Sequence, residues 1–118
     1  MQKISQNLLE TLRKYDTPTI VNSLELLDSK FRTSGFTTEQ LICTDTSLPP
    51  IVGYARTATI SATNEIDQQI KRDRSLAYYQ YVSSGTGPWV SVIQDIDQNP
   101  GFGAFWGEVN SNIHKALG

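Results

Sequence analysis

The clearest pattern in this chain is the segment Trp89-Val90-Ser91-Val92-Ile93-Gln94-Asp95-Ile96. Its centre is almost continuously apolar, and such a run is typical of a strand in a sheet that is covered on both faces. Gly87-Pro88 precedes the segment and residues 97–100 follow it, and both are turn-forming sequences. We therefore predict a buried strand over residues 89–96.

The residues before this strand predict a second strand and a helix. Residues 51–62 are rich in β-forming side chains, and Gly53 within them suggests a bulge. Residues 64–71 are polar and are expected to be exposed. Residues 74–84 carry apolar side chains at helical spacing, and Gly85 suits the position after a helix C-cap.

A last helix is predicted after the glycine-rich passage Gly101-Phe102-Gly103-Ala104-Phe105-Trp106-Gly107. Its apolar face is defined by Trp106, Val109 and Ile113, which recur at helical spacing. The order strand, helix, strand and helix predicts an α/β fold. A strand followed by such a helix normally leads to another parallel strand. Because the sequence stops at Gly118, we expect the N-terminal part of a larger protein, truncated on its C-terminal side.

The start of the chain predicts a pair of helices within residues 1–30. Residues 5–15 repeat apolar side chains at helical spacing. Thr17 is expected to be the N-cap of the second helix and Pro18 its first residue. The side chains expected on the buried face of this helix are Ile20, Val21, Leu24 and Leu27.

Residues 28–50 predict a long connection with one short element at residues 39–42. A loop of this length in a small domain often contributes to a binding surface or an interface. The expected organisation is one domain over residues 1–118, whose α/β core begins at residue 51.

Composition and charge exclude several classes of protein. Of the 118 residues, 38% are apolar and 19% are charged, which is typical of a folded domain. The formal net charge is −2 and no basic stripe exists, so nucleic acid is not an expected partner. No apolar stretch could span a bilayer, and no secretory signal opens the chain. The single cysteine, Cys43, cannot form an internal disulfide, and the expected location is the cytoplasm.

The glycine-rich passage does not predict a dinucleotide site. Gly101, Gly103 and Gly107 depart from the pattern G-x-G-x-x-G, because the last spacing is one residue too long. What remains is a helix N-terminus with free N–H groups, which suits an anion such as a carboxylate.

Asp95, Asp97 and Asn99 imitate the start of a calcium-binding EF-hand loop. Pro100 stands in place of the turning glycine of that loop and Trp106 in place of its bidentate glutamate, so this interpretation fails. We expect instead that Asp95 and Asp97 alternate at the strand end, with one of them in solvent.

Glu108 and His114 are the remaining polar candidates in the last helix. Glu108 lies in the first turn, where the helix dipole stabilises a carboxylate in any protein. It also lies off the apolar face, so it can face a cleft. His114 is the only histidine and lies near the helix C-terminus, where we expect a surface residue favoured by the dipole. These residues alone leave the function open.

Two pairs of segments resemble a known family, and they run in order over nearly the whole chain. The first pair is Asp16-Thr17-Pro18-Thr19-Ile20-Val21-Asn22-Ser23-Leu24 and Ile51-Val52-Gly53-Tyr54-Ala55-Arg56-Thr57-Ala58-Thr59. The second pair is Val92-Ile93-Gln94-Asp95 and Gly103-Ala104-Phe105-Trp106-Gly107-Glu108, of which the last stretch is the most specific. They are similar to the RraA-like family, which includes 4-hydroxy-4-methyl-2-oxoglutarate aldolases.

The resemblance implies a swivelling β/β/α-type domain, here incomplete and preceded by the N-terminal helix pair. It also implies assembly as a homotrimer or a hexamer made of two trimers. Aldolase members cleave 4-hydroxy-4-methyl-2-oxoglutarate, and often decarboxylate oxaloacetate, with Mg²⁺ or Mn²⁺. The metal polarises the 2-oxo acid and stabilises the pyruvate enolate that leaves. The implied partner is therefore a small 2-oxo acid, with no membrane involved.

The family signature is an acidic residue followed, after about twenty residues, by Arg-Asp. That Arg binds the substrate carboxylate and that Asp binds the metal. Glu108 matches the acidic position, which implies a catalytic role in which it contacts the metal only through water. Gly107, Val109 and Asn110 match the backbone positions that receive the substrate carboxylate. The Arg-Asp pair would fall roughly ten residues beyond Gly118, so we expect the chain as given to be inactive.

Two other interpretations stay open. Some members of the family bind ribonuclease E and restrain it, and this chain could be a regulatory protein of that kind. The helix pair and the long connection at residues 28–50 favour the aldolase-like branch, because the regulatory members are more compact. The other interpretation is an incomplete fold whose open sheet edge makes it prone to aggregate.

Overall fold

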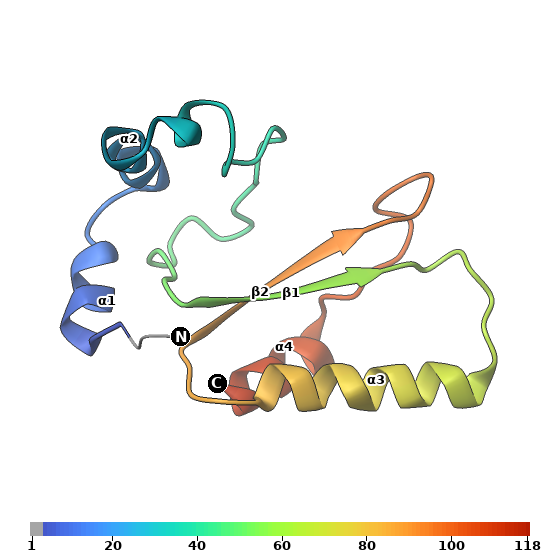
Figure 1. The fold of residues 1–118 in the computed structure, drawn as a ribbon. Coiled ribbons are helices and arrows are strands. Elements are labelled where there is room, and N and C mark those ends of the chain that lie inside the picture. The colour runs from blue at the N-terminus through green and yellow to red at the C-terminus, as the bar shows by residue number, and fades with distance from the viewer. Residues whose placement is uncertain (1–3) are drawn as a thin grey trace. The chain divides into compact units, whose positions relative to one another are not determined.

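The computed structural model describes residues 4–118, which form two compact units with their boundary between Val52 and Gly53. Its elements, drawn in Figure 1, are α1 (Gln6–Leu12), α2 (Thr17–Leu27), the 3₁₀ helix η1 (Ser29–Arg32), β1 (Tyr54–Ile60), α3 (Gln68–Ser83), β2 (Trp89–Asp95) and α4 (Glu108–Leu117). The chain is therefore mixed α/β with a parallel two-stranded sheet, and the α/β prediction is confirmed. Within residues 4–118, every helix is too short or too polar to cross a membrane.

The helices of the first unit begin at polar caps. The Ser5 hydroxyl accepts a hydrogen bond from the Leu8 N–H at 3.2 Å and starts α1. The Asp16 carboxylate accepts from the Thr19 N–H at 2.8 Å and starts α2. The predicted N-cap at Thr17 is therefore wrong by one residue, because the preceding carboxylate satisfies the free N–H and Thr17 is already helical.

Two further predictions for this unit need correction. Leu27, which the sequence predicts on the buried face of α2, is 82% exposed. Ile20, Val21 and Leu24 are half-buried, as expected. Residues 39–42 form neither helix nor strand, and the short element of this connection is η1 instead. Asp28 explains the position of η1, because its carboxylate accepts a hydrogen bond from the Lys30 N–H at 3.0 Å.

The second unit is built on β1, α3 and β2. The two strands are parallel, with Tyr54 opposite Trp89 and Ile60 opposite Asp95. Both strands are shorter than the predicted ranges of residues 51–62 and 89–96. The helix between them begins before the predicted residue 74, because the Asp67 carboxylate accepts hydrogen bonds from the N–H groups of Gln69 at 2.8 Å and Ile70 at 3.2 Å.

Two glycines at the ends of these elements have definite roles. Gly85 follows the C-cap of α3 with a φ of 81°, as its place in the sequence predicts. Gly53 does not form a bulge and lies just before β1. A Cβ atom at this position would lie 2.7 Å from the carbonyl oxygen of Pro88, so the close approach of the two segments requires glycine.

The helices of this unit lie on one side of the sheet, as Figure 1 shows for α3 and α4. Ile93 is half-buried on that side, whereas Val92 points to the opposite face and is 53% exposed. The expected cover on both faces is therefore not found within residues 53–118. The reason is the composition of the outer face, where Thr57, Thr59 and Gln94 stand beside Val92 and tolerate water.

Arg56 joins both strands to α3. Its guanidinium carbon lies 3.7 Å from the centre of the Trp89 ring and 5.0 Å from that of Tyr81. The same group donates a hydrogen bond to the backbone carbonyl of Ser84 at the end of α3. The cation is therefore held by aromatic faces and a carbonyl dipole, and it fixes the helix end against the sheet.

Candidate functional site at the start of α4

Glu108 is the first residue of α4, and its side chain is exposed. The residue before it, Gly107, has extended backbone with φ −161° and ψ −174° and serves as the N-cap without a side-chain hydrogen bond. No described atom lies within 4 Å of the position that a Cβ of Gly107 would occupy. The first N–H groups of a helix have no partner inside it, so Glu108 and Val109 present free donors at this end of α4.

Val109 and Asn110 lie on different sides of α4. Val109 is 72% exposed, although the sequence places it on the apolar face, and Trp106 is 48% exposed. The face that packs against the unit carries Asn110, Ile113, His114 and Leu117, which are all half-buried. The predicted face is therefore wrong by about one residue, because polar contacts of Asn110 and His114 set the rotation of the helix.

Both polar atoms of the Asn110 side chain form hydrogen bonds within the chain. Its Oδ1 accepts a hydrogen bond from the Tyr79 hydroxyl at 2.8 Å, and its Nδ2 donates to the Phe105 carbonyl at 2.6 Å. Only its backbone N–H can therefore serve an anion at the helix start, as the sequence interpretation requires.

His114 is not the surface residue that its place near the helix end predicts. It is half-buried, with its Nε2 at 2.7 Å from the Tyr78 hydroxyl and its Nδ1 at 2.7 Å from the Asn110 carbonyl. Because a carbonyl can only accept, Nδ1 carries a proton and donates it to the Asn110 carbonyl. Burial raises the pKa of the Tyr78 hydroxyl. Trp106 packs on the same imidazole, with ring centres 4.7 Å apart.

The glycine-rich passage before α4 is shaped by the residues around it. The Asp95 carboxylate accepts hydrogen bonds from the N–H of Asp97 at 3.0 Å and from that of Gly101 at 2.7 Å. A Cβ atom at Gly103 would lie 2.3 Å from that of Ala62, so the passage packs tightly against the segment after β1. These two features serve the fold. Gly101 and Gly107 both have open space at their Cβ positions, and of the two only Gly107 adjoins the start of α4.

Asp97 is buried, with 7% of its surface exposed, and Asp95 is half-buried, so the expectation that one of the two lies in solvent is wrong. Its carboxylate accepts from the Ser61 hydroxyl at 2.5 Å, the Thr63 hydroxyl at 2.7 Å and the Ala62 N–H at 2.7 Å. These hydrogen bonds lower the pKa of Asp97 to about 2. The signal in the sequence for this contact is the pair Ser61 and Thr63 directly after β1. The strand pattern alone does not show that these hydroxyl groups bind Asp97.

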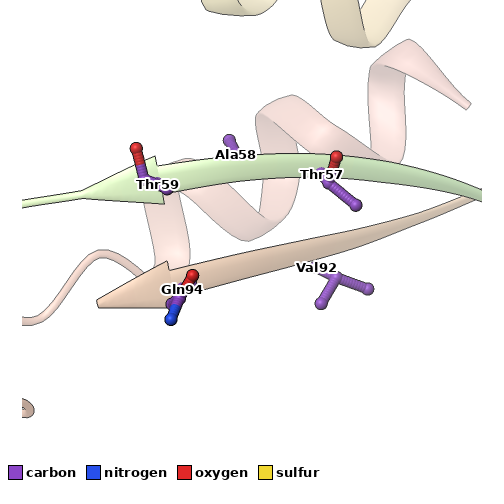
Figure 2. A pocket seen from close by; sticks show the side chains of 5 residues that line it. All are labelled: Thr57, Ala58, Thr59, Val92 and Gln94. Carbon is purple, nitrogen blue, oxygen red and sulfur yellow. The ribbon is translucent and has the colours of Figure 1, made fainter. Parts of the chain in front are cut away.

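A shallow hollow lies on the outer face of the sheet, apart from Glu108. It is lined by Thr57, Ala58, Thr59, Val92 and Gln94. Figure 2 shows the side chains of Thr57, Thr59, Val92 and Gln94 projecting from the two strands. None of these five residues is charged or could act as a general acid or base. The hollow is therefore not a candidate catalytic site.

Neither a metal site nor a known relative is found for the described chain. Residues 4–118 contain no group of three or more His, Cys, Asp or Glu side chains that could hold a metal ion. A lone exposed carboxylate such as Glu108 does not make a ligand set for Mg²⁺, which takes several oxygen ligands. Comparisons with family models, with curated proteins and with solved structures found no match.

Proposed function

We propose that this chain supplies the Glu108 part of the active site of a divalent-metal-dependent 2-oxo acid lyase of the RraA-like family. The reaction is the cleavage of 4-hydroxy-4-methyl-2-oxoglutarate, or the decarboxylation of oxaloacetate. The observation that carries the proposal is the geometry at the start of α4. An exposed Glu108 lies beside N–H groups that the helix leaves unpaired, and the Cβ position of the preceding Gly107 is open.

The residues at this position have chemistry suited to an oxo acid. The backbone N–H groups of Val109 and Asn110 would donate to the substrate carboxylate, which the positive end of the helix dipole also attracts. Glu108, as an exposed carboxylate, would accept a hydrogen bond from a water molecule and orient it. Because two anions would stand close together at this site, a cation has to compensate their charges.

In the family, a divalent cation supplies that charge and acts as the Lewis acid. Its ligand is the Asp of an Arg-Asp pair, and no such pair follows Glu108 in this sequence. The described residues by themselves do not fit the metal, and we assign no step through it to this chain. The proposal therefore includes the statement that residues 1–118 alone do not turn over substrate.

Pyruvate release tests this proposal in two preparations. One is the 118-residue chain, and the other is the chain with whatever coding sequence its gene carries after the Gly118 codon. We expect release that depends on Mg²⁺ or Mn²⁺ only from a product that contains an Arg-Asp pair after Glu108. Pyruvate released by the 118-residue chain would contradict the proposed division of the site.

The regulatory interpretation is an outcome of the same test. A gene product that lacks the Arg-Asp pair, releases no pyruvate and binds ribonuclease E would contradict the lyase proposal and support the regulatory interpretation. The resemblance also leads us to propose a homotrimer or a hexamer, which light scattering of the gene product can test.

A further inference from the structure

The side chain of Asn110 forms a bridge between three parts of the second unit. It reaches Tyr79 on α3 at 2.8 Å and Phe105 in the passage before α4 at 2.6 Å. The direction of each hydrogen bond is determined. The Phe105 carbonyl can only accept, so it faces the amide nitrogen of Asn110, and the amide oxygen is left to accept from the Tyr79 hydroxyl.

The hydrogen bond to Phe105 closes a ring in the chain around Glu108. Phe105 lies three residues before Glu108 and Asn110 two residues after it, so the bond spans the turn in which the extended backbone of Gly107 becomes helical. Tyr79 ties this ring to α3, a helix of 16 residues. Both polar ends of Asn110 are thereby used within the chain, at a position that is half-buried.

We propose that Asn110 is a positioning residue, which fixes the turn from Phe105 to Glu108 and so sets the direction of the Glu108 carboxylate and of the free N–H groups beside it. This role goes beyond the backbone contact with substrate that the sequence interpretation assigns to Asn110. Its catalytic consequence rests on the proposed function, but its geometric consequence does not.

Neither alanine nor aspartate at position 110 reproduces the bridge. Alanine removes both hydrogen bonds. Aspartate keeps an acceptor for Tyr79 but turns a second oxygen toward the Phe105 carbonyl, where repulsion replaces a hydrogen bond. Asn110→Asp is therefore expected to disturb the turn although it conserves the size of the side chain.

The neighbouring tyrosines of α3 provide a matched pair of variants. Tyr78 and Tyr79 are both half-buried, and the hydroxyl of each makes one hydrogen bond to α4. Tyr79 bonds to Asn110, whereas Tyr78 bonds to His114 at 2.7 Å, one turn farther along the helix. Tyr79→Phe therefore removes one support of the bridge. Tyr78→Phe removes a bond to His114, whose Nδ1 bonds to the backbone carbonyl of Asn110 and not to the side chain that forms the bridge.

Amide resonances of the 118-residue chain in ¹H–¹⁵N spectra test the geometric proposal. We expect Tyr79→Phe, Asn110→Ala and Asn110→Asp to shift the resonances of Gly107, Glu108 and Val109, none of which touches the Tyr79 ring hydroxyl. Tyr78→Phe should leave these three in place and shift resonances around His114. Equal urea midpoints for the two tyrosine variants would exclude general destabilisation as the cause. Unchanged Gly107 to Val109 resonances in Asn110→Ala, or equal shifts in the two tyrosine variants, would overturn the proposal.

The catalytic consequence is measured in the gene product that shows lyase activity. There Tyr79→Phe and Asn110→Asp should lower kcat by roughly ten- to a hundredfold, because a misplaced group loses most of its effect, while Tyr78→Phe stays near the parent. Unchanged kcat in Asn110→Asp would refute the positioning role in catalysis. A parent without lyase activity would refute the proposed function instead, and the resonance shifts would still decide on the turn.

Discussion

The Oδ2 atom of Asp97 accepts a hydrogen bond from the backbone N–H of Ala62 at 2.7 Å. Asp97 follows β2 and Ala62 follows β1, so this bond joins the carboxyl ends of the two parallel strands. The same carboxylate accepts from the hydroxyl groups of Ser61 and Thr63, and also from the Thr63 N–H at 3.2 Å. One buried charge thus satisfies four donors of a single short segment.

Replacing Asp97 by alanine should destabilise the second unit strongly. Asp97→Ala leaves the N–H groups of Ala62 and Thr63 without their acceptor, and such groups are costly when they stay partly buried. We expect the melting temperature to fall by roughly 5–10 °C in a circular-dichroism melt. Asp73→Ala, on the exposed surface of α3, is the control and should change it little. Equal melting temperatures for Asp97→Ala and the parent would contradict this account.

The depressed pKa of Asp97 predicts a loss of stability in acid. The hydrogen bonds hold this pKa at about 2, below the ordinary value of 3.8. On acidification the unfolded chain binds its proton first, so the contribution is fully present above pH 3.8 and is lost as the pH falls toward 2. Urea midpoints measured between pH 6 and 2 should therefore decrease as the pH drops from 3.8 toward 2.

Asp97→Asn is the control for that titration. Asp16, Asp28 and Asp45 also have a lowered pKa, and they are present in both proteins. The parent should consequently lose more stability than Asp97→Asn between pH 4 and 2, although the variant is weaker at pH 6. Parallel pH profiles of the two proteins would show that Asp97 does not contribute to the acid sensitivity.

Gly103 and Gly107, which both lie before α4, should respond differently to substitution by alanine. The added Cβ of Gly103→Ala would meet the Cβ of Ala62 at 2.3 Å, and overpacking of this kind costs about 1–3 kcal/mol. Gly107→Ala meets no described atom within 4 Å, and it should cost less than about 1 kcal/mol as the loss of a favourable N-cap. Urea unfolding of both variants measures the difference. A larger loss in Gly107→Ala would contradict the packing described for this passage.

Glu108→Gln should separate function from stability. The exposed carboxylate interacts with the helix dipole, so its neutralisation should cost only about 0.3–1 kcal/mol of stability. In the gene product that releases pyruvate, loss of a carboxylate that acts through metal-bound water should lower kcat by about 10- to 100-fold. Glu65→Gln, at an exposed position before α3, is the control. A Glu108→Gln enzyme with full activity would remove the residue from the proposed site.

The parts of the fold that depend on local sequence could be predicted. Apolar periodicity predicts the second strand and the helix after residue 74. The glycine at position 85 predicts the turn, and in the structure its φ is 81°. The errors at element ends have a common cause, since Asp16 and Asp67 each cap a helix where hydrophobic periodicity gives no signal. Capping depends on a single side chain. In a sequence such as Asp16-Thr17 or Asp67-Gln68, the helix could begin at more than one residue.

The surroundings of the candidate site could be predicted less well. The position of Glu108 at the start of α4 agrees with the sequence, because a glycine-rich passage precedes an amphipathic segment. The rotation of that helix does not, since Val109 is exposed while His114 is half-buried. Its cause is a set of hydrogen bonds to Tyr78 and Tyr79, which lie more than thirty residues earlier in the chain. Contacts over such separations leave no periodic signal in a sequence.

The contact between Asp97 and Ala62 also has a consequence for how the chain folds. The partners are 35 residues apart, and the parallel register pairs Tyr54 with Trp89 over the same separation. Closing a loop of this length costs entropy before any strand hydrogen bond forms, so the sheet cannot nucleate locally. During synthesis, β1 must wait without a partner until the ribosome has released β2, and α3, whose hydrogen bonds are local, is the element able to form in that interval.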